Sequence, residues 1–147
     1  MNSSVLFLLI AILLVGILVF VAIILTGKRA HHFDKEEYQI KFLKIDNSLT
    51  RENEISHNMC VVEADKLLDR AMMEMGTPGR TMGERLKKNS TKFSQLNSVW
   101  YVHKLRNRIA HEHGFQMDYN QAKRALATYK KALKDLGAIW NTKWPLV

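Results

Sequence analysis

The 147-residue chain has one cysteine, two prolines and no charged side chain before Lys28. A single cysteine, Cys60, cannot form an intramolecular disulfide, so the fold does not depend on an oxidising compartment. It also excludes a zinc site built from several thiolates. Nothing near Cys60 in the sequence would lower its thiol pKa, so we expect a small core residue rather than a reactive one.

Several common catalytic frameworks are also missing. The sequence contains no glycine-rich phosphate loop, no HExxH and no paired CxxC. His31 and His32 are adjacent to each other but have no spaced carboxylate or cysteine partner, so we expect no metal site. No cofactor is expected either.

Charge is missing near the N-terminus because residues 5–25 are an unbroken apolar run, VLFLLIAILLVGILVFVAIIL. A helix of that length spans about 31 Å, close to the roughly 30 Å hydrocarbon core of a bilayer. A cleaved signal peptide is the alternative. Its apolar core is only roughly 7 to 15 residues long and follows basic residues, which Met1 to Ser4 do not supply. We therefore expect an uncleaved transmembrane helix.

The charges that flank this run predict its orientation. Lys28 and Arg29 follow it directly, and short basic flanks stay on the cytoplasmic side of a membrane. The N-terminus is then expected outside and the rest of the chain in the cytoplasm, with the lipid bilayer as one partner. The expected parts are a transmembrane helix at 5–25, a juxtamembrane linker at 26–33, a helical domain at 34–138 and a tail at 139–147.

Apolar residues between Phe33 and Gly137 recur every three or four positions, which predicts helices. The GTPGR sequence at 76–80 is the only concentrated break in this pattern. We predict an all-α protein in which the transmembrane helix precedes a bundle of four longer helices and a short one. The expected helices begin at the N-caps Asp34, Asn53 and Asp118, at Glu84 within a Thr81–Glu84 capping box, and near Ser94. In the same order, they end in the polar run Thr50–Glu54, at Met75, at Gly137, near Asn89 and at Ala110.

In the tail, Trp140 and Trp144 lie at helical spacing. We expect Trp140 to pack back onto the bundle, with a partner surface as the alternative.

Positive charge is concentrated in one segment. Residues 76–111 hold eight Lys and Arg against one acid, whereas residues 27–75 hold eight against ten. A local excess of this kind suits a polyanion such as RNA. An anionic membrane surface or a solvated face would explain it equally well. The basic candidates for binding are Arg85, Lys87, Lys88, Lys104 and Arg108.

The same segment ends in HKLRNRIAHE, residues 103–112. On a helix, His103 shares a face with Arg106 and Asn107, and Asn107 shares one with His111. An imidazole that moves protons and a guanidinium that holds phosphate are the groups needed to cleave RNA without metal. The amide of Asn107 can orient either of them.

Arg106-Asn107-x-x-x-His111 resembles the Arg-x4-6-His signature of HEPN domains, and LRNRIAHEHGFQMD resembles the toxin-type pattern of that family. The resemblance covers roughly residues 34–138. It implies a homodimer that brings two motif copies to one cleft, and RNA cleavage by attack of the RNA's own 2′-hydroxyl, leaving a cyclic phosphate. It also implies Arg106 at the phosphate, His111 as the proton-transferring imidazole and Asn107 as the orienting group.

One position departs from the toxin-type pattern. His113 stands where these members often have Tyr, which argues against regulation at that position by a nucleotidyltransferase-type antitoxin. His103, Glu112 and His113 are further candidates for binding.

The sequence thus predicts a membrane-anchored, metal-independent ribonuclease. A non-catalytic HEPN-like adaptor that binds a nucleotide, a nucleic acid or a protein is the main alternative. A purely structural membrane protein is the third.

Overall fold

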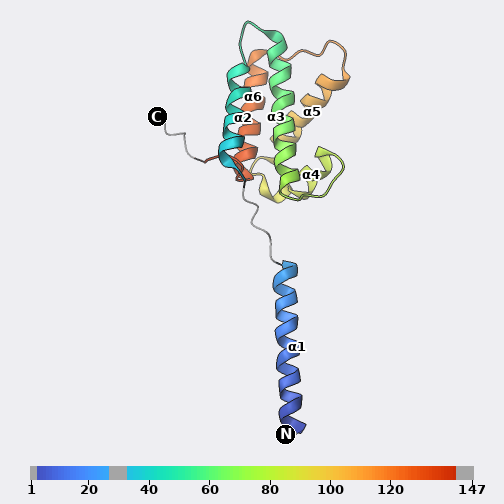
Figure 1. The fold of residues 1–147 in the computed structure, drawn as a ribbon. Coiled ribbons are helices and arrows are strands. Elements are labelled where there is room, and N and C mark those ends of the chain that lie inside the picture. The colour runs from blue at the N-terminus through green and yellow to red at the C-terminus, as the bar shows by residue number, and fades with distance from the viewer. Residues whose placement is uncertain (1–2, 27–32, 142–147) are drawn as a thin grey trace. The chain divides into compact units, whose positions relative to one another are not determined.

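The computed structural model describes residues 3–26 and 33–141, and the chain divides into two units, Met1–His31 and His32–Val147 (Figure 1). The secondary structure of the described residues is entirely helical, as the sequence predicts. The first unit contains α1 (Ser3–Thr26), whose residues Ser3–Ala22 have a mean hydropathy of 3.4. α1 is therefore long and apolar enough to cross a membrane. A signal sequence would meet the same criteria of length and composition.

The second unit contains the four longer helices and the short one that the apolar periodicity predicts. They are α2 (Lys35–Ser48), α3 (Glu54–Glu74), α4 (Met82–Lys88), α5 (Leu96–His111) and α6 (Tyr119–Asp135), with a 3-10 turn, η1 (Ser90–Lys92), between α4 and α5.

The predicted N-caps of the longer helices are confirmed by their hydrogen bonds. Asp34 Oδ1 accepts from the Glu37 amide at 3.0 Å, and Asn53 Oδ1 accepts from the Ile55 amide at 3.1 Å. Asp118 and Gln121 form a complete capping box, in which each side chain accepts from the other residue's amide. These bonds satisfy amides that the first turn of a helix leaves without partners.

Two helices begin two residues away from their predicted starts. α4 begins at Met82 rather than Glu84, because Thr81 is the N-cap and accepts from the Glu84 amide at 3.2 Å. The Glu84 carboxylate accepts from the Arg80 amide instead of closing a reciprocal box. α5 begins at Leu96 rather than Ser94. The amide and hydroxyl of Ser94 both donate to Asp135 at the end of α6, which holds Ser94 outside the helix.

α3 runs through the middle of the second unit and packs against α2, α4, α5 and α6 (Figure 1). The expected apolar stripes face this core. The largest fully buried side chains include Tyr38, Phe42, Val61, Leu68, Met72, Leu126, Tyr129 and Leu133. Cys60 is buried among them, and burial raises the pKa of its thiol, so the prediction of a core cysteine is confirmed.

The ends of the second unit differ from expectation. Phe33 and Ile139, which the sequence places in flanking segments, are buried in the core. Trp140 is 45% exposed, with Lys35 Nζ 5.1 Å from its ring centroid. Trp140 thus lies against the surface of the bundle beside Lys35 of α2, while its neighbour Ile139 takes the buried position. His31, His32 and Trp144 lie outside the described residues.

The loop from Glu112 to Asp118 is attached to the first turns of α3. The Asn58 amide group donates to the Phe115 carbonyl at 2.8 Å and accepts from the Met117 amide at 3.0 Å. His57, also buried, contacts the Met117 carbonyl through Nδ1 at 3.0 Å. These contacts fix the C-terminal end of α5 and the start of α6 relative to α3.

Candidate functional site

α5 places the polar residues of the motif beside the core. Its buried side chains Val99, Val102 and Leu105 pack against the bundle. His103, Arg106 and Asn107 occupy positions i, i+3 and i+4, so they share a face of the helix as the sequence predicts. Their hydrogen bonds and ion pairs join them to one another and to α3.

The α3 partner is Asp65, whose side chain is only 5% exposed. Its Oδ1 accepts from His103 Nδ1 at 3.0 Å and from the Tyr129 hydroxyl of α6 at 2.9 Å. Its Oδ2 lies 3.5 Å from Arg106 Nε. A carboxylate removed from water requires donors of this kind, because an unpaired buried charge is strongly destabilising. Burial, followed by the charge of Asp65, raises the pKa of Tyr129 well above its ordinary value, so Tyr129 stays a donor.

Asn107 completes a closed ring of contacts with Asp65, His103 and Arg106. Arg106 Nη1 donates to Asn107 Oδ1 at 3.2 Å, and Asn107 Nδ2 lies 3.5 Å from His103 Nε2. Because a carboxylate only accepts, Nδ1 of His103 carries its proton toward Asp65. In the neutral imidazole, Nε2 is then the acceptor. We call Asp65, His103, Arg106, Asn107 and Tyr129 the Asp65 cluster.

Asp65, His103, Arg106 and Asn107 of this cluster line a cavity of about 440 Å³ formed by α3, by α4 and the segment before it, and by α5. That volume is within the roughly 300 to 1,000 Å³ of small-ligand pockets. The lining residues are Asp65, Lys66, Asp69, Arg80, Thr81, Met82, Gly83, Arg85, His103, Arg106 and Asn107. The cavity thus combines an imidazole, an amide and several cations.

His111, the expected proton-transferring residue, lies elsewhere on α5. It is the last residue of the helix, it is exposed, and it does not line this cavity. At about 100° per residue, five positions place His111 about 140° around the helix from Arg106. The structure therefore brings Arg106 and Asn107 together with His103 rather than with His111.

Arg108, Glu112 and His113, which lie close to His111 in the sequence, are also exposed. Arg108 Nε donates to both carboxylate oxygens of Glu112 at 2.9 Å, and its guanidinium lies 4.2 Å from the Phe115 ring centroid. The hydrogen bond from Arg108 holds the pKa of Glu112 below its ordinary value. His113 is exposed in the loop that follows.

The basic segment is partly neutralised by acids of α3. Arg85 is buried, and its Nε and Nη2 donate to the two oxygens of Asp69 at 2.7 Å. Lys87 and Lys88 of α4 and Lys104 of α5 are exposed. Of the eight Lys and Arg residues in 76–111, Arg85 and Arg106 thus form ion pairs with acids of α3.

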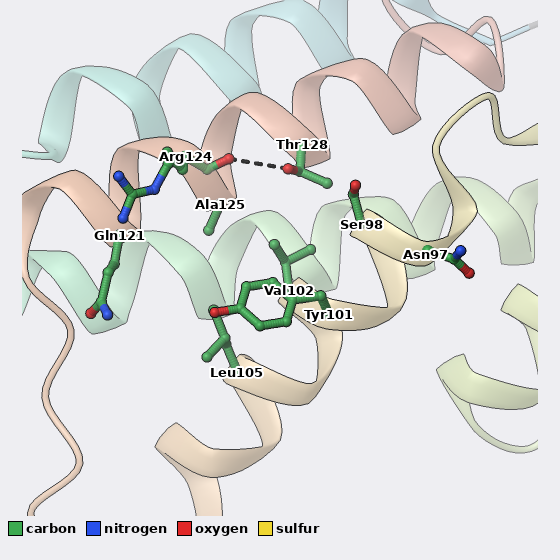
Figure 2. Close-up of a pocket in the computed structure, with 9 residues that line it drawn as sticks. All are labelled: Asn97, Ser98, Tyr101, Val102, Leu105, Gln121, Arg124, Ala125 and Thr128. Carbon is green, nitrogen blue, oxygen red and sulfur yellow. Dashed lines mark hydrogen bonds between the residues drawn. The ribbon is translucent and has the colours of Figure 1, made fainter.

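A second cavity lies between α5 and α6, on the other side of α5 (Figure 2). It measures about 420 Å³, and Figure 2 shows Tyr101, Val102 and Leu105 of α5 opposite Ala125 and Arg124 of α6. Its lining contains a guanidinium but neither an imidazole nor a carboxylate. Of the two cavities, the Asp65 cavity is therefore the better candidate for proton transfer by a side chain near neutral pH.

Among residues 3–26 and 33–141, no group of three or more His, Cys, Asp or Glu side chains is arranged to hold a metal ion.

Asp65 and Tyr129 are the members of the cluster that the sequence alone did not identify as site residues. A signal for Asp65 exists, because it lies next to Ala64 on the apolar stripe of α3, between Val61 and Leu68. An acid at such a position is buried only with partners. Tyr129 gives no comparable signal, because an aromatic residue on an apolar stripe is an ordinary core residue.

The chain was compared with protein-family models, with curated proteins and with solved structures, and none of them matches it.

Proposed function

We propose that this protein is a HEPN-like domain, anchored in a bilayer by α1, that binds RNA and cleaves it without a metal ion. The observation that carries the proposal is the position of Arg106, whose guanidinium donates to Asn107 and lies 3.5 Å from Asp65, at a polar cavity that also contains an imidazole. The side chain of Arg106 keeps 30% of its surface exposed, so a phosphate can reach it.

Each motif residue has a role in this proposal. Arg106 binds the scissile phosphate and stabilises the negative charge that develops on it. Asn107 orients the guanidinium through its Oδ1. His111, exposed at the end of α5, transfers a proton. The exposed cations Lys87, Lys88 and Lys104 attract the RNA backbone in a salt-dependent way.

The HEPN resemblance further suggests a homodimer in which two copies of the motif share one cleft. An exposed His111 is compatible with such an arrangement, because it could serve the cavity of a second copy. The basic residues Lys28 and Arg29 suggest that the second unit is cytoplasmic, where RNA is available.

The test is RNA cleavage by the full chain in detergent with EDTA present. We expect wild type to cut single-stranded RNA, and we expect Arg106→Ala and His111→Ala each to lower the rate at least about 100-fold. Arg124→Ala is the matched control, because it removes the one guanidinium of the other α5 cavity. Equal losses in Arg124→Ala and Arg106→Ala would contradict the proposed site.

The absence of His111 from the Asp65 cavity favours a second candidate function, a non-catalytic adaptor that binds RNA or a nucleotide through Arg106. In that case Arg106→Ala lowers the affinity for RNA, and wild type shows no turnover on any RNA. Measuring binding and cleavage on the same preparation separates the two functions.

A further inference from the structure

From the geometry of the Asp65 cluster we infer that His103, which lies outside the HEPN signature, is the residue that accepts the proton of the attacking ribose hydroxyl, with Asp65 as its positioning residue. This inference rests on the proposed function. It assigns a proton acceptor to the cavity that contains Arg106, where the motif histidine is absent.

The orientation of the His103 ring supports this role. Nδ1 is 3.0 Å from Asp65 Oδ1, which fixes the proton on Nδ1 and leaves the Nε2 lone pair as the acceptor in the neutral ring. The only partner of Nε2 among the described residues is Asn107 Nδ2, at 3.5 Å. Hydrogen bonds to nitrogen or oxygen are ordinarily about 2.7 to 3.2 Å long, so a substrate hydroxyl can replace this weak contact.

The position of His103 relative to Arg106 also fits. The two residues are three positions apart on α5, both line the cavity, and both contact the same carboxylate. Asn107 also bridges Arg106 Nη1 and His103 Nε2, so a phosphate on Nη1 would lie on the Nε2 side of the ring. The His103 side chain is 12% exposed, so bulk water is largely kept away from the ring.

Tyr129 and Arg106 help to hold Asp65 where it can orient the His103 ring. The Tyr129 hydroxyl donates to the same oxygen as His103, and Arg106 lies at the second oxygen. These contacts hold the carboxylate in place, so it can hold the imidazole in one tautomer and stabilise the imidazolium that forms. Asp65 itself does not touch the RNA.

Nε2 of neutral His103 takes the proton of the 2′-hydroxyl, the 2′-oxygen forms a bond to phosphorus, and the bond from phosphorus to the 5′-oxygen breaks. The 5′-oxygen takes a proton from the imidazolium of His111 of a second copy, because His111 of the same chain does not line this cavity. The products are a 2′,3′-cyclic phosphate and a 5′-hydroxyl.

The first experiment compares His103 variants of the full chain. We expect His103→Gln to lower kcat at least about 100-fold with little change in KM. Ser98→Ala, on the opposite side of α5, is expected to keep wild-type kcat. We also expect added imidazole to restore part of the activity of His103→Ala. A purely structural role would give no rescue.

The second experiment starts with wild type, so its first measurement does not depend on the stability of a variant. In wild type with ¹⁵N-labelled histidine, NMR should find His103 protonated on Nδ1. A saturating dinucleotide with a 2′-methoxy group should shift its Nε2 resonance. In Asp65→Asn we expect the Nδ1 tautomer to lose its dominance and kcat to fall more than KM changes.

The outcomes separate the inference from the function. A wild type that cuts no RNA overturns both. A wild type that cuts RNA while folded His103→Gln keeps its kcat overturns the role of His103 alone. An Nε2-protonated His103, or an Nε2 resonance that does not respond to the bound dinucleotide, overturns it as well.

Discussion

The two halves of the Arg-Asn-x-x-x-His motif lie in different environments. Arg106 and Asn107 belong to a network of hydrogen bonds and ion pairs around a buried carboxylate contributed by α3. His111 and the Arg108–Glu112 pair are exposed at the end of α5. The side chains of the first half are held in defined positions, whereas those of the second half are exposed to solvent. Sequence spacing alone does not distinguish these environments.

The largest expected effect tests the buried half. We expect Asp65→Ala to reduce the free energy of unfolding by about 3 kcal/mol, because it leaves Arg106 without its carboxylate and Tyr129 without its acceptor. Urea unfolding of the full chain in detergent, followed by tryptophan fluorescence, measures the change. Asp65→Asn keeps the volume and isolates the effect of the charge. A loss below about 1 kcal/mol in Asp65→Ala would show that the network adds little to stability.

The attachment of the exposed half is the next test. We expect Asn58→Ala to cost about 2 kcal/mol, because two backbone hydrogen bonds of the loop after α5 lose their partner. Hydrogen exchange should increase at Met117, whose amide donates to Asn58. Asn120→Ala, exposed on α6, serves as the control. Unchanged exchange at Met117 would mean that Asn58 does not hold this loop.

A smaller effect is expected at Tyr129. Tyr129→Phe removes one donor from Asp65 and should cost about 1 kcal/mol near neutral pH. The folded protein holds the pKa of Tyr129 well above 10.0. The hydroxyl therefore ionises first in the unfolded chain, and its contribution is complete below pH 10.0 and lost as the pH rises further. Unfolding curves from pH 8 to 11 should converge for wild type and Tyr129→Phe, and curves that stay parallel would contradict this.

The smallest effect is expected at the exposed pair. Glu112→Gln breaks its ion pair with Arg108, yet we expect no measurable change in the free energy of unfolding, since exposed pairs contribute little. The same urea titration applies, repeated at low and high salt. A clear loss of stability would show that the end of α5 is more constrained than its exposure indicates.

Much of the fold could be predicted because it depends on local signals. Asp34, Asn53 and Asp118 cap helices through bonds to residues two or three positions away, and the apolar stripes have helical spacing. The errors came from contacts between distant segments. Ser94 is held out of α5 by Asp135, forty-one positions away, and Phe33 and Ile139, which the sequence places in flanking segments, are buried in the core.

The candidate site was predictable to the extent that it lies on one helix. The shared face of His103, Arg106 and Asn107 follows from their spacing. The contribution of Asp65 depends on where α3 crosses α5, which no local pattern gives. For the same reason the burial of Arg85 against Asp69 could not be read from a count of charges.

The most direct test of the account is the chemistry of the RNA ends. Full-length protein is incubated with 5′-labelled single-stranded RNA in EDTA, and the products are analysed for their termini. The account predicts 2′,3′-cyclic phosphate and 5′-hydroxyl ends from wild type and no such products from Arg106→Ala. Intact RNA after incubation with folded wild type, or products that carry 5′-phosphates, would contradict it.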